Sequence, residues 1–219
     1  LQVNLISHSV LPGIALALSI GLDPAMGGVI SGLVGALVAE KLSLKRNENH
    51  EAIINTVLAG TLGFGVLLIP LLGIRIDLES ILFGDLLTAN LDDLIRTLIA
   101  LTIFLGLVIT SYPQLVHVGL DPEAAESSGI NVTSLRFLLG FSTALVIVSS
   151  MSAVGVIIVI GLLSAPTLLG LVQAKSLKIA ILRSSIFGSL ISLIGFIISM
   201  IFNLSPGPLI GCLCFISLA

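Results

Sequence analysis

Residues 180–203 read AILRSSIFGSLISLIGFIISMIFN and contain one charged side chain, Arg183, close to their start. An α-helix rises 1.5 Å per residue, so about 20 apolar residues cross the roughly 30 Å hydrocarbon layer of a membrane. This stretch has that length and that composition. It predicts a transmembrane helix, and the remainder of the chain repeats the pattern.

The composition of the whole chain is that of a membrane protein. Of its 219 residues, 56% are hydrophobic and only 10% are charged, whereas soluble domains carry about 25% charged residues. We expect an all-α, polytopic integral membrane protein with about eight transmembrane helices in a single domain over residues 1–219. Both ends resemble cut ends, which suggests a fragment. The predicted spans are 1–21, 24–41, 51–74, 93–116, 134–151, 154–173, 180–203 and 206–219.

Two connections between spans are unusually short. Residues 21–24 (GLDP) predict a tight turn, and residues 151–153 (MSA) barely separate the fifth span from the sixth. The fifth and sixth spans can therefore form one broken, re-entrant element, which a membrane tolerates only where protein buries it or a cavity wets it. In the second span Gly28, Gly32 and Ala36 recur every four residues, a spacing that lets helices pack closely.

Lysine and arginine predict the orientation of the chain, because they are enriched in cytoplasmic loops. Seven of the nine fall on one side of the predicted topology, and only Arg75 and Arg96 fall on the other. We therefore expect loops 42–50, 117–133 and 174–179 in the cytoplasm and the acidic loop 75–92 outside. The seven residues are Lys41, Lys45, Arg46, Arg136, Lys175, Lys178 and Arg183.

His8 is the one ionisable residue that lies deep within a predicted span. Such a residue is costly in hydrocarbon and normally faces a partner or a water-filled path. Neutral imidazole also binds zinc and related metals. Asn4 lies one turn earlier on the same helix face, so an amide oxygen and an imidazole can point at one ion. The alternative is a histidine satisfied by a hydrogen bond across a helix interface.

The loop 117–133 predicts a short helix. Asp121 suits an N-cap, Pro122 suits the first helical position, Glu123 suits the first turn, and Gly129 suits the end. An isolated helix of about two turns is marginal, so another surface should pack on it. A partner protein would serve, and a capped connector is the simpler alternative.

Several functions are excluded or disfavoured. The net charge is −3 and no basic patch is present, so nucleic-acid binding is not expected. No phosphate-binding loop, nucleophile elbow, zinc-protease motif or intramembrane aspartate pair occurs, so ATP binding by such a loop is excluded and an intramembrane protease is disfavoured. His50 and His117 are expected at the membrane interface. Cys212 and Cys214 face different directions on a helix, which argues against a shared metal or disulfide.

Five segments, in the same order, resemble the permease subunit of the zinc/manganese/iron class of ABC transporters. The first resembles the family's D-A-L-S-H-A-V-L-P-G-I-A-L and contains Asn4 and His8. The third resembles the family's cytoplasmic D-x-x-x-A-x-x-x-G and supplies Asp121, Ala125 and Gly129. The segments are 4–16 (NLISHSVLPGIAL), 82–87 (LFGDLL), 121–129, 154–166 and 205–208 (SPGP).

This resemblance implies a multi-pass protein of a bacterial inner or plasma membrane that imports a divalent transition metal. The family pairs two permease copies, a homodimer, with two cytoplasmic ATPase subunits and an extracellular or periplasmic metal-binding protein. The resemblance places ATP and its hydrolysis on the ATPase partner, so this chain is not expected to be an enzyme, and it places no cofactor on this chain. It makes His8 and Asn4 transient metal ligands. It makes Asp121, Glu123, Ala125 and Gly129 part of the helix that couples to the ATPase.

One departure from the family pattern bears on the cargo. The family usually has Asp at the position of Asn4, and a neutral amide holds a hard ion such as Mn²⁺ more weakly than a carboxylate. The preferred ion is therefore left open. Two other functions also stay open, an ABC permease for an iron chelate or cobalamin-like ligand and a secondary transporter or membrane scaffold without an ATPase.

Overall fold

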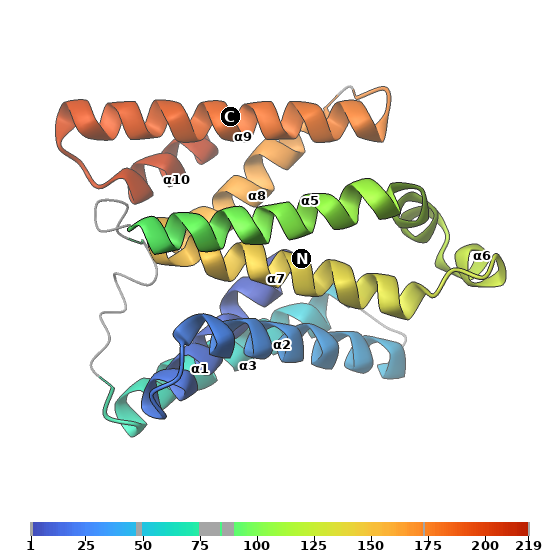
Figure 1. Cartoon of the computed structure of the whole chain (residues 1–219), viewed down its shortest axis with the longest axis horizontal. Coiled ribbons are helices and arrows are strands. Elements are labelled where there is room, and N and C mark those ends of the chain that lie inside the picture. Colours follow the sequence, from blue (N-terminus) through green and yellow to red (C-terminus); the bar gives the residue numbers. More distant parts are fainter. Residues whose placement is uncertain (1, 47–49, 75–83, 85–89, 173, 219) are drawn as a thin grey trace. The chain divides into compact units, whose positions relative to one another are not determined.

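Each of the eight predicted spans is a helix in the computed structural model of the chain (Figure 1), which describes residues 2–46, 50–74, 84, 90–172 and 174–218. A ninth helix, the short α6, lies in the predicted loop 117–133. The helices of the described residues are α1 (Gln2–Ser19), α2 (Pro24–Arg46), α3 (His50–Leu71), α5 (Leu91–Leu120), α6 (Pro122–Ser127), α7 (Val132–Val154), α8 (Val156–Leu171), α9 (Leu177–Phe202) and α10 (Pro206–Ile216).

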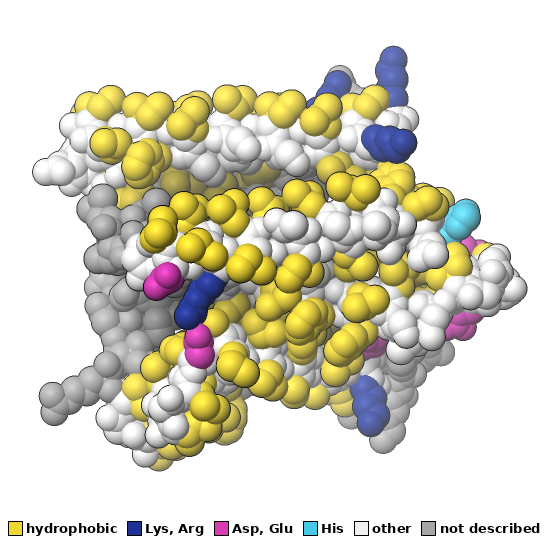
Figure 2. All heavy atoms as spheres, in the orientation of Figure 1, with side chains coloured by type: hydrophobic (Ala, Val, Ile, Leu, Met, Phe, Trp, Pro, Cys, Tyr) yellow, Lys and Arg dark blue, Asp and Glu magenta, His cyan; other side chains and the backbone are white. Residues whose placement is uncertain are grey.

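Five of these helices, α2, α3, α5, α7 and α9, are long and apolar enough to cross a membrane. The apolar segments of α1, α8 and α10 are shorter, and α10 has only 11 residues, or about 16 Å of rise. Figure 2 shows hydrophobic side chains along the helices on one face and charged side chains near helix ends. The chain is thus an all-α, multi-pass membrane protein.

Some helices extend beyond the predicted spans. The predicted loop 42–50 is wrong at both ends, because α2 continues to Arg46 and α3 begins at His50. α5 continues to Leu120, so its 30 residues rise about 45 Å and project past the hydrocarbon layer. The acidic loop 75–92 and the LFGDLL segment fall largely outside the described residues.

The chain divides into two compact units by its internal contacts. The first unit holds residues 1–75 and 91–149, and the second holds residues 76–90 and 150–219. In the first unit α1 packs against both α2 and α3, and α2 also contacts α3. The core of this unit follows α1, where Val10 and Ala15 have no exposed surface.

Glycines let α1 and α2 approach closely. A side chain on Gly13 would overlap the main chain at Gly27, and a side chain on Gly27 would overlap Gly13. The predicted small-residue face takes part, since Gly28 and Gly32 pack on Val10 and Ile6. Without a hydrophobic drive between helices in lipid, such close contact supplies much of the packing energy.

Hydrogen bonds add to this packing around Ser9, which is fully buried. The Ser9 hydroxyl donates to Thr61 Oγ1 of α3 at 3.0 Å. The Ser31 hydroxyl of α2 donates to the Ser9 carbonyl at 2.5 Å. One residue of α1 is therefore bonded to both neighbouring helices, which fixes the register of all three.

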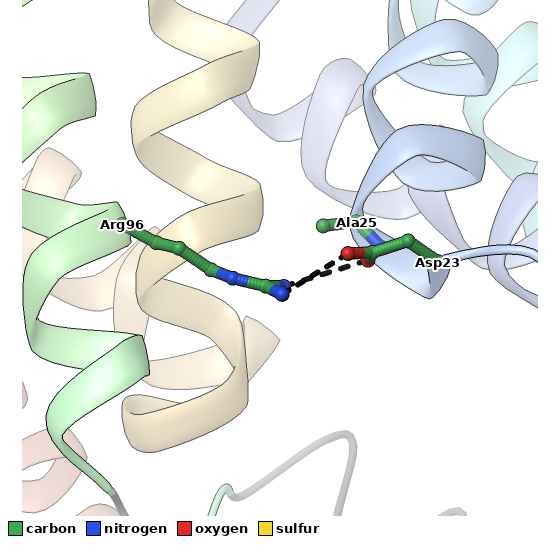
Figure 3. A network of polar contacts seen from close by, with 3 residues as sticks. All are labelled: Asp23, Ala25 and Arg96. Atoms are coloured by element: carbon green, nitrogen blue, oxygen red, sulfur yellow. Dashed lines mark hydrogen bonds and ion pairs between the residues drawn. The ribbon is translucent and has the colours of Figure 1, made fainter.

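Two ion pairs join helix ends within the first unit. Arg96 at the start of α5 contacts Asp23 at 3.1 Å, and Asp23 Oδ1 also accepts the Ala25 amide at 2.8 Å (Figure 3). Arg136 at the start of α7 contacts Glu40 in α2 at 3.5 Å. The predicted topology places both partners of the first pair outside and both partners of the second inside, so each pair is consistent with it.

In the second unit α8, α9 and α10 pack on one another. Their shared core contains Ile158, Ala165, Ile191, Ile210 and Cys214. At the close approach of α9 and α10, a side chain on Gly195 would meet Ile210. Cys212 is exposed while Cys214 is buried, so the two side chains face different directions, as their spacing predicts.

The break between the fifth and sixth spans lies at Gly155 and not at 151–153. α7 continues through Val154, and α8 begins at Val156. Gly155 alone separates them, at φ +81° and ψ 155°, a conformation that is essentially restricted to glycine. The sequence therefore located the interruption correctly to within a few residues.

Candidate metal path and cytoplasmic helix

His8 is held in a defined orientation by its own helix. Its Nδ1 lies 2.9 Å from the main-chain oxygen of Asn4, one turn earlier, and the ring is partly buried. A carbonyl oxygen only accepts hydrogen bonds, so Nδ1 is the donor in this contact, and in a neutral imidazole Nε2 then has the lone pair that a metal ion needs. Metal-binding histidines are commonly oriented in this way. The bond lies within α1, so it is not the cross-helix bond of the alternative interpretation.

Pro12 frees a second candidate ligand atom at the same residue. Pro12 lies inside α1 and has no amide hydrogen, so the carbonyl of His8, four residues earlier, loses its helical partner. A carbonyl freed in this way inside a membrane needs a new partner such as water, a side chain or an ion. His8 thus offers an imidazole nitrogen and a carbonyl oxygen. The H-x-x-x-P spacing, His8 to Pro12, is the signal in the sequence from which this freed carbonyl can be predicted.

Asn4 contributes an unsatisfied oxygen. Its Oδ1 is buried, and the described residues provide it with no hydrogen-bond partner. A buried amide oxygen without a partner is costly, so an unpaired one indicates a missing water, ion or neighbouring group. Asn4 and His8 are joined through the Asn4 main chain.

The donor set around His8 is neutral and sparse. Among the described residues no group of three or more histidine, cysteine, aspartate or glutamate side chains is able to hold a metal ion. Nitrogen and neutral oxygen ligands suit a divalent transition metal that binds transiently during transport. They suit less well a metal that is held at high affinity. The assignment of His8 and Asn4 to metal stays a prediction.

The short helix α6 forms as its sequence predicts. Asp121 is the N-cap, and its Oδ1 accepts the amide of Ala124 at 3.0 Å. Pro122 opens the helix, and Gly129 follows its end at φ +84°. All of these features are local, which is why the sequence predicts them well.

α6 is packed onto its own chain on one side. Ala125 is 3% exposed and lies in a cluster with Val118 of α5 and Val132 and Leu135 of α7. Of the four residues assigned to ATPase coupling, Asp121 therefore caps the helix, Ala125 anchors it and Gly129 ends it. Glu123 is also exposed, and its side chain neither caps the helix nor anchors it. Their coupling role stays a prediction.

Two hollows were not predicted. In the first unit a cleft of about 470 Å³ is bordered by Glu40 and Arg136. In the second unit a groove of about 510 Å³ is bordered by hydroxyls of α9, including Ser185 and Ser189, which bond to carbonyls of their own helix. Two features of the sequence could have predicted these hollows, namely the charged residues near span ends and the spacing of the serines in α9.

The remaining histidines lie away from His8 along the chain. His117 is exposed in the last turn of α5, as expected of an interfacial residue. His50 begins α3.

Comparison with known proteins identifies the family. Residues 1–219 match the ABC 3 transport family. The chain is 32% identical to the manganese transport system membrane protein MntC of Listeria monocytogenes, over 94% of this chain and 74% of that protein. It is 32% identical to the high-affinity zinc uptake system membrane protein ZnuB of Haemophilus influenzae, over 93% of this chain and 78% of that protein.

A solved structure shares the fold. The structure of PsaBC from Streptococcus pneumoniae in complex with Fab matches with a TM-score of 0.85 and 30% sequence identity. The match covers 99% of this chain and 80% of the other. The sequence motifs, the helical membrane fold and these similarities agree, and the chain belongs to the ABC 3 transport family.

Proposed function

We propose that this chain is the membrane-spanning subunit of an ATP-driven importer of a divalent transition metal ion. The family and its manganese and zinc transport relatives support this function. Within the chain, the observation that carries the proposal is the oriented imidazole of His8 inside an apolar helix, with a freed carbonyl beside it. A transport path needs ligands of this kind in a place where hydrocarbon would otherwise exclude a cation.

His8 would act by replacing part of the ion's hydration shell. Nε2 supplies a nitrogen ligand, while the His8 carbonyl and Asn4 Oδ1 supply neutral oxygens. Neutral ligands lower the barrier for a strongly hydrated cation without creating a deep well from which it escapes slowly. The ion is the substrate of the chain, which holds no cofactor of its own in this proposal.

Partners would supply the energy and the directionality. ATP would be hydrolysed by two cytoplasmic ABC ATPase subunits, and the exposed side of α6, with Glu123, would be their contact on this chain. Asp121, Ala125 and Gly129 would give α6 the stiffness to transmit a displacement to α5 and α7, because they fix its cap, its anchor and its end. A metal-binding protein outside and a second permease copy would complete the transporter, within a bilayer and without nucleic acid.

The proposal is tested by metal uptake into proteoliposomes that contain the full-length protein with its ATPase and metal-binding partners. His8→Ala is expected to lower initial uptake at limiting metal by about tenfold or more, since the loss of even an outer contact of a metal ligand costs this much. His117→Ala is the matched control, because His117 is an exposed histidine outside α1. Uptake by His8→Ala equal to that of wild type would contradict the role of His8.

The same assay separates the other functions. An importer of an iron chelate or cobalamin-like ligand would show no inhibition of its uptake by excess free Mn²⁺ or Zn²⁺. A secondary transporter would continue to take up metal after ATP is removed and would stop when the ion gradient collapses. Either result would contradict the proposed function.

A further inference from the structure

The cleft of the first unit is apolar along most of its wall. It measures about 470 Å³ and is bordered by α1, α2 and α7, with Leu37, Phe137 and Leu138 among its lining residues. These three side chains are each nearly half exposed, in a part of the chain that the sequence places at the cytoplasmic end of two membrane spans. Acyl chains are the natural neighbours of such side chains.

Part of the lining of the cleft is polar and carries both signs of charge. Glu40 and Arg136 border it, 3.5 Å apart, with side chains 37% and 43% exposed. Partly exposed ion pairs of this kind contribute little stability, so a competing ligand can open this one easily. The hydroxyl groups of Thr133 and Ser134, in the first turn of α7, also border the cleft.

We propose that this cleft binds a phospholipid with an ethanolamine headgroup from the cytoplasmic leaflet. The phosphate would lie between the Arg136 guanidinium and the hydroxyls of Thr133 and Ser134, close to the start of α7, where a helix favours an anion. The ammonium group would lie on Glu40. The acyl chains would continue along Phe137 and Leu138.

Charge complementarity distinguishes this headgroup from its common alternatives. A glycerol headgroup carries the phosphate but gives Glu40 no cation. A choline headgroup carries a cation without N–H donors, so it forms no hydrogen bond with a carboxylate. Only a headgroup with both a phosphate and a protonated amine satisfies Arg136 and Glu40 at once.

The test uses the full-length protein purified in detergent and mixed with phosphatidylethanolamine, phosphatidylglycerol or phosphatidylcholine, with the bound lipid counted by native mass spectrometry. Wild type is expected to retain phosphatidylethanolamine severalfold more than either other lipid. Glu40→Gln should lose the preference over phosphatidylglycerol, and Arg136→Gln should lose retention of both. Arg96→Gln is the matched control, because Arg96 forms a comparable exposed ion pair with Asp23 away from the cleft.

A second pair of variants leaves the charges in place. Gly140 borders the cleft, and a Cβ added there meets nothing within 4 Å, so Gly140→Leu should fold and displace the lipid by filling space. Gly106→Leu is its control, since Gly106 also has open space around it but lies on α5.

Equal retention of the three lipids by wild type, or unchanged retention by Gly140→Leu, would overturn the proposal. So would cross-linking of Phe137→Cys between two copies, because the cleft would then be a protein interface.

Discussion

At the scale of the residue, the chain concentrates its unusual chemistry in about two turns of α1. Asn4, His8 and Pro12 follow one another at intervals of four residues. The Asn4 carbonyl orients the imidazole, and the proline frees the His8 carbonyl. The predicted metal ligands thus lie on one helix, and the amide of Asn4 adds no charge to them.

This neutrality leads to a prediction for Asn4→Asp. A carboxylate is a stronger ligand for a hard cation, so the variant should bind Mn²⁺ more tightly and release it more slowly. We expect a lower KM and a lower maximal rate of Mn²⁺ uptake in proteoliposomes, with Zn²⁺ affected less. Asn131→Asp is the control, since Asn131 accepts the Ser134 amide as a cap that Asp forms equally well. Unchanged Mn²⁺ kinetics in Asn4→Asp would place Asn4 outside the path.

At the scale of the element, α6 is a small rigid body. Its cap, its buried alanine and its terminal glycine each fix one part of it. Helices of six residues are not stable alone, so this one owes its form to capping and to the contacts of Ala125 with α5 and α7.

Substitutions at Asp121 test the cap. Asp121→Ala should destabilise α6 by about 1 kcal/mol, whereas Asp121→Asn retains the cap and loses only the charge. We therefore expect the alanine variant to weaken stimulation of the partner ATPase by the metal-loaded receptor, and the asparagine variant to retain most of it. Equal loss in both variants would assign the effect to the charge and not to the rigidity of the helix.

The packing of α1 on α2 gives a second prediction at this scale. Gly27→Leu forces a side chain into the main chain at Gly13, and such overpacking typically costs about 1–3 kcal/mol. The variant should show a lower thermal unfolding midpoint in detergent. Gly60→Leu is the control, because a Cβ at Gly60 in α3 meets nothing within 4 Å. A midpoint for Gly27→Leu no lower than that of Gly60→Leu would contradict the close approach of these helices.

At the scale of the whole molecule, the predicted topology assigns each loop and helix end to one side of the membrane. The ion pairs Asp23–Arg96 and Glu40–Arg136 support it, because each joins residues that the lysine and arginine distribution already assigns to one side. The extension of α5 toward α6 agrees with it as well.

Accessibility of single cysteines checks this topology. In a chain with Cys212→Ser and Cys214→Ala, a cysteine at Ser19 should react with a membrane-impermeant maleimide in intact cells, while one at Ser128 should react only after permeabilisation. Both positions are exposed at helix ends, so they differ only in the predicted side. Labelling of Ser128→Cys in intact cells would reverse the orientation.

The sequence alone determined the features that depend on local composition. Lipid selects a helix by the apolar length of a segment, so each of the eight predicted spans coincides with a helix, and five of the described helices are long and apolar enough to cross a membrane. Caps are equally local, which is why Asp121, Pro122 and Gly129 were read correctly. His8 stood out because a polar residue inside such a span is rare.

Only the tertiary structure decided which faces of the helices meet. In a helix that is apolar on all sides, composition does not distinguish the face toward lipid from the face toward protein, because both surroundings are equally apolar. The contact of Gly13 with Gly27, the bonds of Ser9 to two helices and the cleft at Glu40 and Arg136 depend on shape and register. These arise when distant segments are brought together, and no single segment encodes them.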